Sequence, residues 1–281
     1  MKKRLTRFLP FLLAFTIALP SYSVFAEEEN QAKETQTNET NKTQADETTA
    51  NDTLSLAAET AVLIDAASGE ILYDKDADKK MYPASITKLM TILLALENGK
   101  LTDEITFSHD AVYNIEPGSA HIAILEGETL TLEQVLRAII LRSANEASNG
   151  VAEYVDGSVE AFAKHMTERA KELGCTNTNF VNANGLFDEN HYPTAHDMAL
   201  IARELLKHEE YRSMMSETDY EIPPTNLQTE TRYLHGQHQM LNPNSIYYYK
   251  DAIGGKTGYT SEAKNTLVTY AEKNDHTLVS V

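Results

Sequence analysis

The segment spanning residues 83–99 constrains the fold of this 281-residue chain more than any other stretch. Its apolar side chains recur every three or four residues, which predicts a helix in the core. A proline suits the first turn of a helix and a glycine its end, so Pro83 and Gly99 mark the expected bounds. The apolar positions are Ile86, Leu89, Met90, Leu93, Leu94 and Leu96.

Ser85 and Lys88 lie three positions apart at the start of this segment, and a helix stacks such residues on one side. A serine hydroxyl is a poor nucleophile until a base takes its proton. A lysine amine can take it only when uncharged, and burial or a nearby cation favours that form by lowering the amine pKa. The spacing alone is weak evidence, because Ser261 and Lys264 repeat it where we expect an exposed turn.

The composition excludes several classes of protein. The formal charge is −18, and such acidity repels nucleic acid and anionic membrane surfaces, so we expect neither as a partner. The chain has no glycine-rich phosphate loop and no dinucleotide fingerprint, and we expect no cofactor. Cys175 is the single cysteine, which rules out an intramolecular disulfide and favours a buried structural thiol.

Two N-terminal segments are expected to lie outside the folded domain. Residues 1–26 combine four basic residues, an apolar run over 8–19 and small residues near position 26, which is typical of a secretory signal peptide. Residues 27–54 are rich in Glu, Thr, Asn and Gln, which predicts a disordered acidic linker. Association with a membrane would then require an uncleaved signal or segments absent from this chain.

Residues 55–281 are expected to fold as one domain. The pattern predicts strands at 61–65, 71–74 and 105–107, helices at 131–140, 146–155, 159–173 and 194–206, and a hairpin of strands at 265–270 and 277–281. Strands near both ends with helices between them favour an α/β (α+β) fold. We therefore expect a mostly antiparallel sheet with helices on both faces and a helical lobe.

Two further polar clusters accompany the Ser85–Lys88 pair. Ser143 and Asn145 fall in a short connection between two expected helices, and Lys256-Thr-Gly258 falls in a glycine-interrupted strand. Glycines in such a strand allow the close approach of a ligand or another backbone. Each cluster is common by chance, but their order, separations and contexts fit one known arrangement.

With these three motifs the sequence resembles the penicillin-recognising serine hydrolases. Within them it is most similar to the D-alanyl-D-alanine carboxypeptidases among the low-molecular-weight penicillin-binding proteins. The resemblance runs from about residue 57 to residue 281 and includes the stretches 184–186, 191–199 and 254–260. Members of the family continue beyond the point that corresponds to Val281, so we expect the domain to be truncated at its C-terminal end.

The resemblance implies a β-lactamase/transpeptidase-like fold and the removal of the terminal D-alanine from peptidoglycan stem pentapeptides. Ser85 would be the acylated nucleophile, Lys88 the general base and Ser143 the proton relay to the leaving amine. The substrate would be bound by Asn145, Lys256, Thr257, Gly258 and Tyr259. β-Lactam antibiotics would act as inhibitors, no metal would be needed, and the enzyme would work on the cell-wall side of a bacterial membrane.

The resemblance also implies finer roles. The backbone N–H groups of Ser85 and Tyr259 would form the oxyanion hole, and Lys256 with Thr257 would bind the terminal carboxylate. Two positions depart from the family pattern. Glu146 stands where relatives often have Asp, and Tyr259 stands where some have His.

Three other functions remain open from the sequence. A serine β-lactamase of the common class needs a Glu-x-x-Leu-Asn loop, and residues 238–242 offer His in place of Glu. A non-catalytic penicillin-binding or sensor module would share the fold. A metallopeptidase could use His191, His196, His235 and His238, but no His-Glu-x-x-His motif is present. Residues 247–249 are three tyrosines that could line a substrate groove, but we expect them to form a packed loop before the strand that holds Lys256.

Overall fold

The computed structural model describes residues 55–281, so the expected signal peptide and acidic linker lie outside the described residues. The strands are β1 (Ala61–Asp65), β2 (Ile71–Lys75), β3 (Glu104–Thr106), β4 (Thr129–Thr131), β5 (Asp219–Ile222), β6 (Arg232–His235), β7 (Ala252–Thr260), β8 (Lys264–Lys273) and β9 (His276–Ser280). The helices are α1 (Lys88–Asn98), α2 (His109–Tyr113), α3 (Leu132–Arg142), α4 (Asn145–Asp156), α5 (Val159–Glu172), α6 (Ala195–Leu205) and α7 (Glu209–Met215). Two 3-10 helices, η2 (Ala84–Thr87) and η3 (Gln239–Leu241), complete the described elements.

The main sheet has five strands in the order β2-β1-β9-β8-β7, and every pairing in it is antiparallel. The pairing of β1 with β9 joins the first and last described strands, with Ile64 opposite Val279. Helix α6 packs on this sheet, and the Tyr270 hydroxyl of β8 donates to the carbonyl of Ala202 in α6 at 3.2 Å. The mixed fold with an antiparallel sheet, expected from the sequence, is confirmed.

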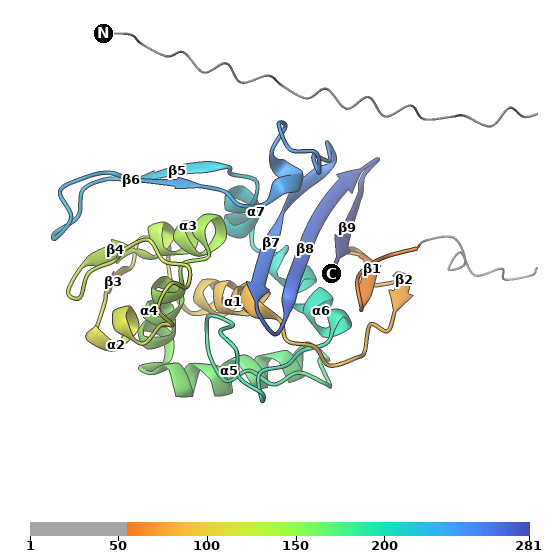
Figure 1. Ribbon diagram of the computed structural model, residues 1–281, viewed down its shortest axis with the longest axis horizontal. Helices are drawn as coiled ribbons and strands as arrows, with labels where there is room; N and C mark the ends of the chain where they lie inside the picture. Colours follow the sequence, from red (N-terminus) through yellow and green to blue (C-terminus); the bar gives the residue numbers. More distant parts are fainter. Residues whose placement is uncertain (1–54) are drawn as a thin grey trace, which may run out of the picture. The chain divides into compact units, whose positions relative to one another are not determined.

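A helical lobe lies beside the sheet, with α1 between the two (Figure 1). The lobe holds α2 to α5 and the two-stranded sheet β3–β4, as Figure 1 shows. Helix α3 starts at the expected capping box, in which the Thr131 hydroxyl accepts from the Gln134 N–H and the Gln134 side chain accepts from the Thr131 N–H. The hairpin β5–β6 extends from α7 and packs on α3.

The helix expected from the 83–99 pattern forms in two parts, the 3-10 turn η2 followed by α1. Every residue from Lys88 to Ala95 is buried, so α1 is covered on all sides along its first two turns. Burying a single leucine or isoleucine contributes about 1.5–3 kcal/mol, and α1 buries a run of such side chains. Helix α1 is therefore a rigid element that fixes the position of Lys88 at its start and of Ser85 in the preceding turn.

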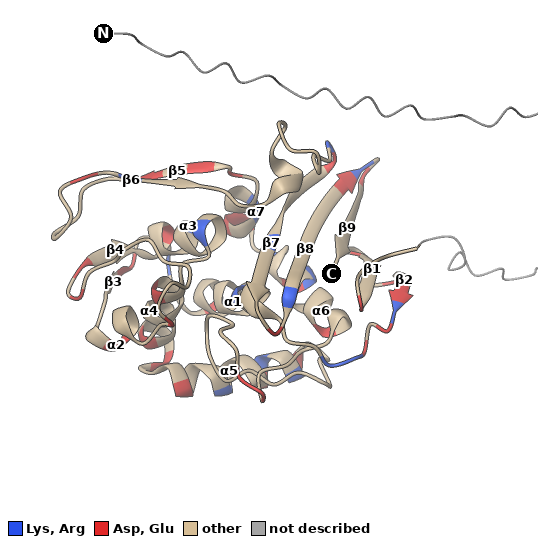
Figure 2. Cartoon of the chain, viewed as in Figure 1, with Lys and Arg blue, Asp and Glu red and all other residues tan. Residues whose placement is uncertain are grey.

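The outer helix α5 carries charged residues of both signs, as Figure 2 shows. Arg169 on this helix pairs with Glu97 of α1 at 2.7 Å and with Glu204 of α6 at 3.5 Å. These half-buried pairs join three helices below the sheet. Within residues 55–281, no helix has the length and apolar character needed to cross a membrane.

Two smaller expectations have different outcomes. Cys175 is a buried free thiol, as expected from the sequence, and burial raises its pKa to about 12. The three tyrosines at 247–249 are exposed, so the expected packed loop is wrong there. Their aromatic character suggested packing, but they lie exposed in an irregular segment before β7.

Candidate active site

Ser85 lies in the 3-10 turn η2, directly before α1. A 3-10 turn has three residues per turn and therefore eclipses positions i and i+3. As a result the Lys88 Nζ atom lies 2.9 Å from the Ser85 Oγ atom. Ala84 precedes the serine with φ +48°, a strained conformation for a residue with a side chain. Gly185 makes room for this turn, because a Cβ atom there would collide with the Ala84 carbonyl.

Lys88 is fully buried among oxygen atoms. Besides the serine hydroxyl, its Nζ atom contacts the Asn145 Oδ1 atom at 2.7 Å and the Asn184 carbonyl at 2.5 Å. Burial and then the charge of Lys256 hold the pKa of Lys88 well below its ordinary value, while Glu146 acts in the opposite direction. This environment favours an uncharged amine, which is the form that can accept a proton from Ser85.

Ser143 and Lys256 form a second hydroxyl–amine pair. Ser143 ends α3 in the left-handed conformation, with φ +58°, and this sharp turn lets α4 begin at Asn145. The Lys256 Nζ atom donates to the Ser143 Oγ atom at 3.0 Å and to the Thr257 carbonyl at 2.8 Å. Burial lowers the pKa of Lys256 to about 7, so both of its protonation states are accessible near neutral pH.

Strand β7 lies against the nucleophile turn. Gly258 is so close to it that a Cβ atom would lie 2.8 Å from the Ser85 backbone nitrogen. On the neighbouring strand β8, the Thr266 hydroxyl donates to the Pro83 carbonyl at 2.7 Å, which fixes the turn to the sheet. Tyr259 is 65% exposed beside this contact. The glycine therefore allows the close backbone approach that the sequence pattern indicated.

Residues 183–184, which the sequence analysis did not assign to the site, also contact Lys88 and its helix. The Asn184 carbonyl accepts from Lys88, and the Asn184 side chain donates to the Asn149 Oδ1 atom at 3.1 Å. The Thr91 hydroxyl donates to the Ala183 carbonyl at 2.6 Å, which ties the same segment to α1. The Asn-Gly pair at 184–185 predicts a turn at this position. It does not predict the contact with Lys88, because the acceptor is a backbone carbonyl that any residue type could supply.

The structure brings the expected polar residues of all three motifs together. Ser85, Lys88 and Asn145 form one continuous set of contacts, Ser143 and Lys256 form the second, and the two-residue spacing of Ser143 and Asn145 links the sets. The second serine–lysine pair is exposed, as expected: Ser261 lies in the turn after β7 and Lys264 is the first residue of β8.

The four histidines considered for a metal site have separate partners. His191 is buried, and its ring lies 2.8 Å from the Thr87 hydroxyl, while His196 pairs with Asp78. His235 pairs with Asp219 at 2.5 Å, and His238 lies 3.2 Å from the Val268 carbonyl. Across residues 55–281, no group of three or more His, Cys, Asp or Glu side chains has the placement to hold a metal ion.

A serine hydroxyl next to a buried lysine amine is the chemical arrangement of an enzyme that transfers acyl groups through a serine ester. The sequence profile of the D-alanyl-D-alanine carboxypeptidase family Peptidase_S11 matches residues 43–281, and the chain belongs to this family.

Individual relatives agree with this membership. The chain is 38% identical over 234 residues to D-alanyl-D-alanine carboxypeptidase DacF of Bacillus subtilis, covering 81% of this chain and 57% of that protein. It is 34% identical over 238 residues to D-alanyl-D-alanine carboxypeptidase DacC of Escherichia coli, covering 81% of this chain and 56% of that protein. The chain thus spans little more than half the length of these two relatives.

Solved structures show the same fold. The crystal structure of the Streptomyces K15 DD-transpeptidase is similar with a TM-score of 0.74 and 26% identity, covering 81% of this chain and 89% of that one. A D-alanyl-D-alanine carboxypeptidase from Mycobacterium tuberculosis H37Rv is similar with a TM-score of 0.71 and 27% identity, covering 79% of this chain and 81% of that one.

Proposed function

We propose that this protein is a serine-type D-alanyl-D-alanine carboxypeptidase that removes the terminal D-alanine from peptidoglycan stem pentapeptides. The observation that carries the proposal is the 2.9 Å contact between the Ser85 hydroxyl and the buried amine of Lys88. Membership of the Peptidase_S11 family supports the reaction class. The residues act in two steps, acylation and hydrolysis of the ester.

In acylation, the Ser85 Oγ atom attacks the carbonyl of the D-Ala–D-Ala bond and its proton passes to Lys88. The backbone N–H groups of Ser85 and Tyr259 stabilise the oxyanion of the tetrahedral intermediate. Ser143, with Lys256 behind it, carries the proton from Lys88 to the leaving amine, so the bond breaks and free D-alanine departs. Water then hydrolyses the ester and regenerates the serine.

Substrate binding uses Asn145 at the start of α4 and residues 256–258 of β7. Asn145 holds the peptide amide, Lys256 and Thr257 bind the terminal carboxylate, and Gly258 lets the strand approach the substrate backbone. The pKa of about 7 at Lys256 fits this role. A bound carboxylate favours the charged amine, so substrate binding draws a proton onto Lys256 when the pH is near 7.

Penicillins should acylate the same serine, since a β-lactam also offers a strained carbonyl to the nucleophile and a carboxylate to Lys256. We further propose that residues 1–26 direct export, that residues 27–54 form a linker, and that residues 55–281 act on the cell-wall side of the membrane. The residue pattern of the N-terminal segment supports export.

The direct test is the release of D-alanine from a blocked pentapeptide that ends in D-Ala-D-Ala. We expect release by the wild type and at least about a 10³-fold slower reaction for Ser85→Ala, because the nucleophile is lost. Ser261→Ala is the matched control, since Ser261 has the same spacing to a lysine but lies in an exposed turn.

The outcomes separate the alternatives. No release of D-alanine, together with a stable penicillin adduct, would indicate a non-catalytic penicillin-binding module. Rapid turnover of penicillin without release of D-alanine would indicate a β-lactamase. Release that is unaffected by Ser85→Ala would refute the assignment of the nucleophile.

A further inference from the structure

A buried ion pair between Glu128 and Arg232 lies outside the residues that the proposed reaction uses. Its Nη1–Oε1 and Nη2–Oε2 distances are 2.6 and 2.7 Å, which is a bidentate geometry. The Glu128 side chain is fully buried and the Arg232 side chain is 10% exposed. Glu128 directly precedes β4 in the helical lobe and Arg232 begins β6, so the pair joins the β5–β6 hairpin to the lobe.

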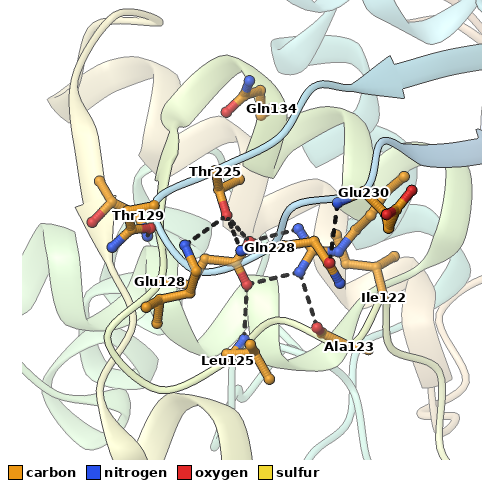
Figure 3. A network of polar contacts seen from close by, with 12 residues as sticks. Ile122, Ala123, Leu125, Glu128, Thr129, Gln134, Thr225, Gln228 and Glu230 are labelled. Atoms are coloured by element: carbon orange, nitrogen blue, oxygen red, sulfur yellow. Dashed lines mark hydrogen bonds and ion pairs between the residues drawn. The ribbon is translucent and has the colours of Figure 1, made fainter.

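The same two side chains fix the backbone of the segment from Ala123 to Leu125. The Leu125 N–H donates to the Glu128 Oε2 atom at 2.9 Å, and Arg232 donates to the Ala123 carbonyl at 3.0 Å (Figure 3). The Thr225 hydroxyl donates to the Glu128 Oε1 atom at 2.7 Å. Burial alone would raise the pKa of Glu128, but these hydrogen bonds offset it and leave the pKa below its ordinary value.

The other end of this segment contacts the motif that holds Ser143. The Ala120 carbonyl accepts from the Asn145 N–H at 2.9 Å. The Ile122 N–H donates to the Glu146 Oε1 atom at 2.7 Å, and Glu146 is itself buried. These two bonds fix the first turn of α4, in which Asn145 contacts Lys88.

Residues 114–128 form no helix or strand between α2 and β4, so side-chain contacts decide where this segment lies. The continuous path runs from the ion pair to Ala123 and Leu125, then along the chain to Ala120 and Ile122, and from there to Asn145. Each link is a hydrogen bond of 3.0 Å or less or a few residues of chain.

We propose that Glu128 and Arg232 are positioning residues for acyl transfer, which hold residues 120–125 so that Ser143 and Asn145 stand correctly against Lys88. The kinetic part of this proposal rests on the proposed function. A displacement of about 1 Å in a catalytic group can slow a reaction about 10²-fold. The ion pair therefore has an effect on the reaction that its contribution to stability alone does not explain.

A second ion pair in the chain offers a matched control. Arg137 of α3 and Glu217 also form a bidentate pair, at 2.7 and 2.8 Å, and the Arg137 side chain is 11% exposed. This pair likewise joins the lobe to the chain near β5. Within residues 55–281, Arg137 and Glu217 form no hydrogen bond or ion pair with residues 120–125.

The test compares Glu128→Gln and Arg232→Lys with Glu217→Gln and Arg137→Lys. Glu128→Gln keeps the shape and removes the charge, and Arg232→Lys keeps the charge and removes the bidentate geometry. For each variant we would measure the rate constant of acylation by a fluorescent penicillin and the hydrogen exchange of the Ile122 and Asn145 amides. A double variant, Glu128→Leu with Arg232→Met, replaces the pair by apolar groups and guards against simple unfolding.

We expect acylation to slow about 10- to 100-fold in both Glu128 and Arg232 variants and in the double variant, with faster exchange of both amides. The control variants should change the rate less than about twofold at equal folded fraction. The proposal is overturned if exchange of the two amides is unchanged in the Glu128 and Arg232 variants. It is also overturned if exchange rises but the acylation rate does not fall below that of the controls.

The two proposals fail in different ways. If the wild type is not acylated at all, the proposed function is refuted, while the exchange measurement still tests whether the ion pair holds residues 120–125. If the wild type is acylated normally and only the variants disagree with expectation, the positioning role alone is refuted.

Discussion

Buried Lys256 should make the free energy of unfolding increase with pH above neutrality. Its pKa is about 7 in the folded protein against an ordinary value of 10.5, a difference of about 3.5 pH units. Between these two pH values the unfolded state binds more protons than the folded state, so stability rises with pH. At about 1.4 kcal/mol per unit, the full effect is about 5 kcal/mol, and about 2 kcal/mol of it falls between pH 7 and pH 9.

The variant Lys256→Met isolates this effect, because methionine has a similar unbranched length and no charge. The folded variant no longer pays the cost of burying an ammonium group, so it should be the more stable protein near pH 7 by up to about 4 kcal/mol. The loss of the hydrogen bonds to Ser143 and Thr257 reduces that advantage by about 1–3 kcal/mol. Removing the charge of Lys256 also removes one cause of the lowered Lys88 pKa, so the stability of the variant depends still less on pH.

The assay is urea unfolding of both proteins at pH 7, 8 and 9. Tyr211 and Tyr270, whose pKa values are raised above 10.0, act in the opposite direction mainly above this range. Cys175, with an ordinary pKa of 9.0, contributes slightly near pH 9, but equally in both proteins, so its effect cancels in the difference. The wild type should gain about 2 kcal/mol relative to the variant between pH 7 and pH 9. A change in the difference of less than about 0.5 kcal/mol would refute the conclusion that Lys256 is buried with a depressed pKa.

Three further expectations follow from the contacts. Gly258→Ala should slow penicillin acylation at least about 10-fold without changing the circular dichroism spectrum, because the added Cβ atom would press on the Ser85 backbone nitrogen and on Thr266. A rate equal to wild type would contradict the close approach of β7. Burial lowers the pKa of His191 to about 4, so the folded state binds fewer protons than the unfolded state below pH 6.5. This difference should lower the free energy of unfolding by about 3 kcal/mol between pH 6.5 and pH 4. In acid unfolding, the His191→Gln variant should lack this part of the decrease, and an equal decrease in both proteins would contradict the burial of the imidazole. Cys175, with a pKa raised to about 12, should react with iodoacetamide at pH 8 only after unfolding in urea; labelling of the native protein at the rate of a free thiol would contradict its burial.

Local patterns in the sequence predicted the local parts of the fold. The apolar spacing of residues 86–96 located the core helix, and the capping box at Thr131 located the start of α3. The pairing of β1 with β9 could not be predicted in the same way, because more than 200 residues separate Ile64 from Val279. A strand pattern indicates that a segment joins a sheet, but the packing of the whole domain decides which strand becomes its neighbour.

The candidate site was predictable for two different reasons. The contact between Ser85 and Lys88 follows from their spacing within one helical turn. The approach of Asn145 to Lys88 spans 57 residues and came from the motif resemblance, since spacing gives no distance at that separation. The tight fit of Lys88 also depends on the turn being a 3-10 helix, which the apolar pattern does not distinguish from an α-helix.

Other parts of the site left no pattern to find. The Asn184 carbonyl that contacts Lys88 is a backbone atom, and any residue type could supply it. Glu128 and Arg232 are 104 positions apart, and the sequence contains many other carboxylates that the arginine could have met. Only the packing of the β5–β6 hairpin on α3 decides that these two charges are buried together.

The role of the Ser85–Lys88 pair is tested most directly by locating the penicillin adduct with peptide mass spectrometry while its rate of formation is measured. We expect one adduct on Ser85 in the wild type and none in Ser85→Ala. In Lys88→Ala the adduct should form about 10²- to 10⁴-fold more slowly, because the base is removed. An adduct on another residue, or acylation of Lys88→Ala at the wild-type rate, would contradict the claim that the buried amine of Lys88 activates the hydroxyl of Ser85.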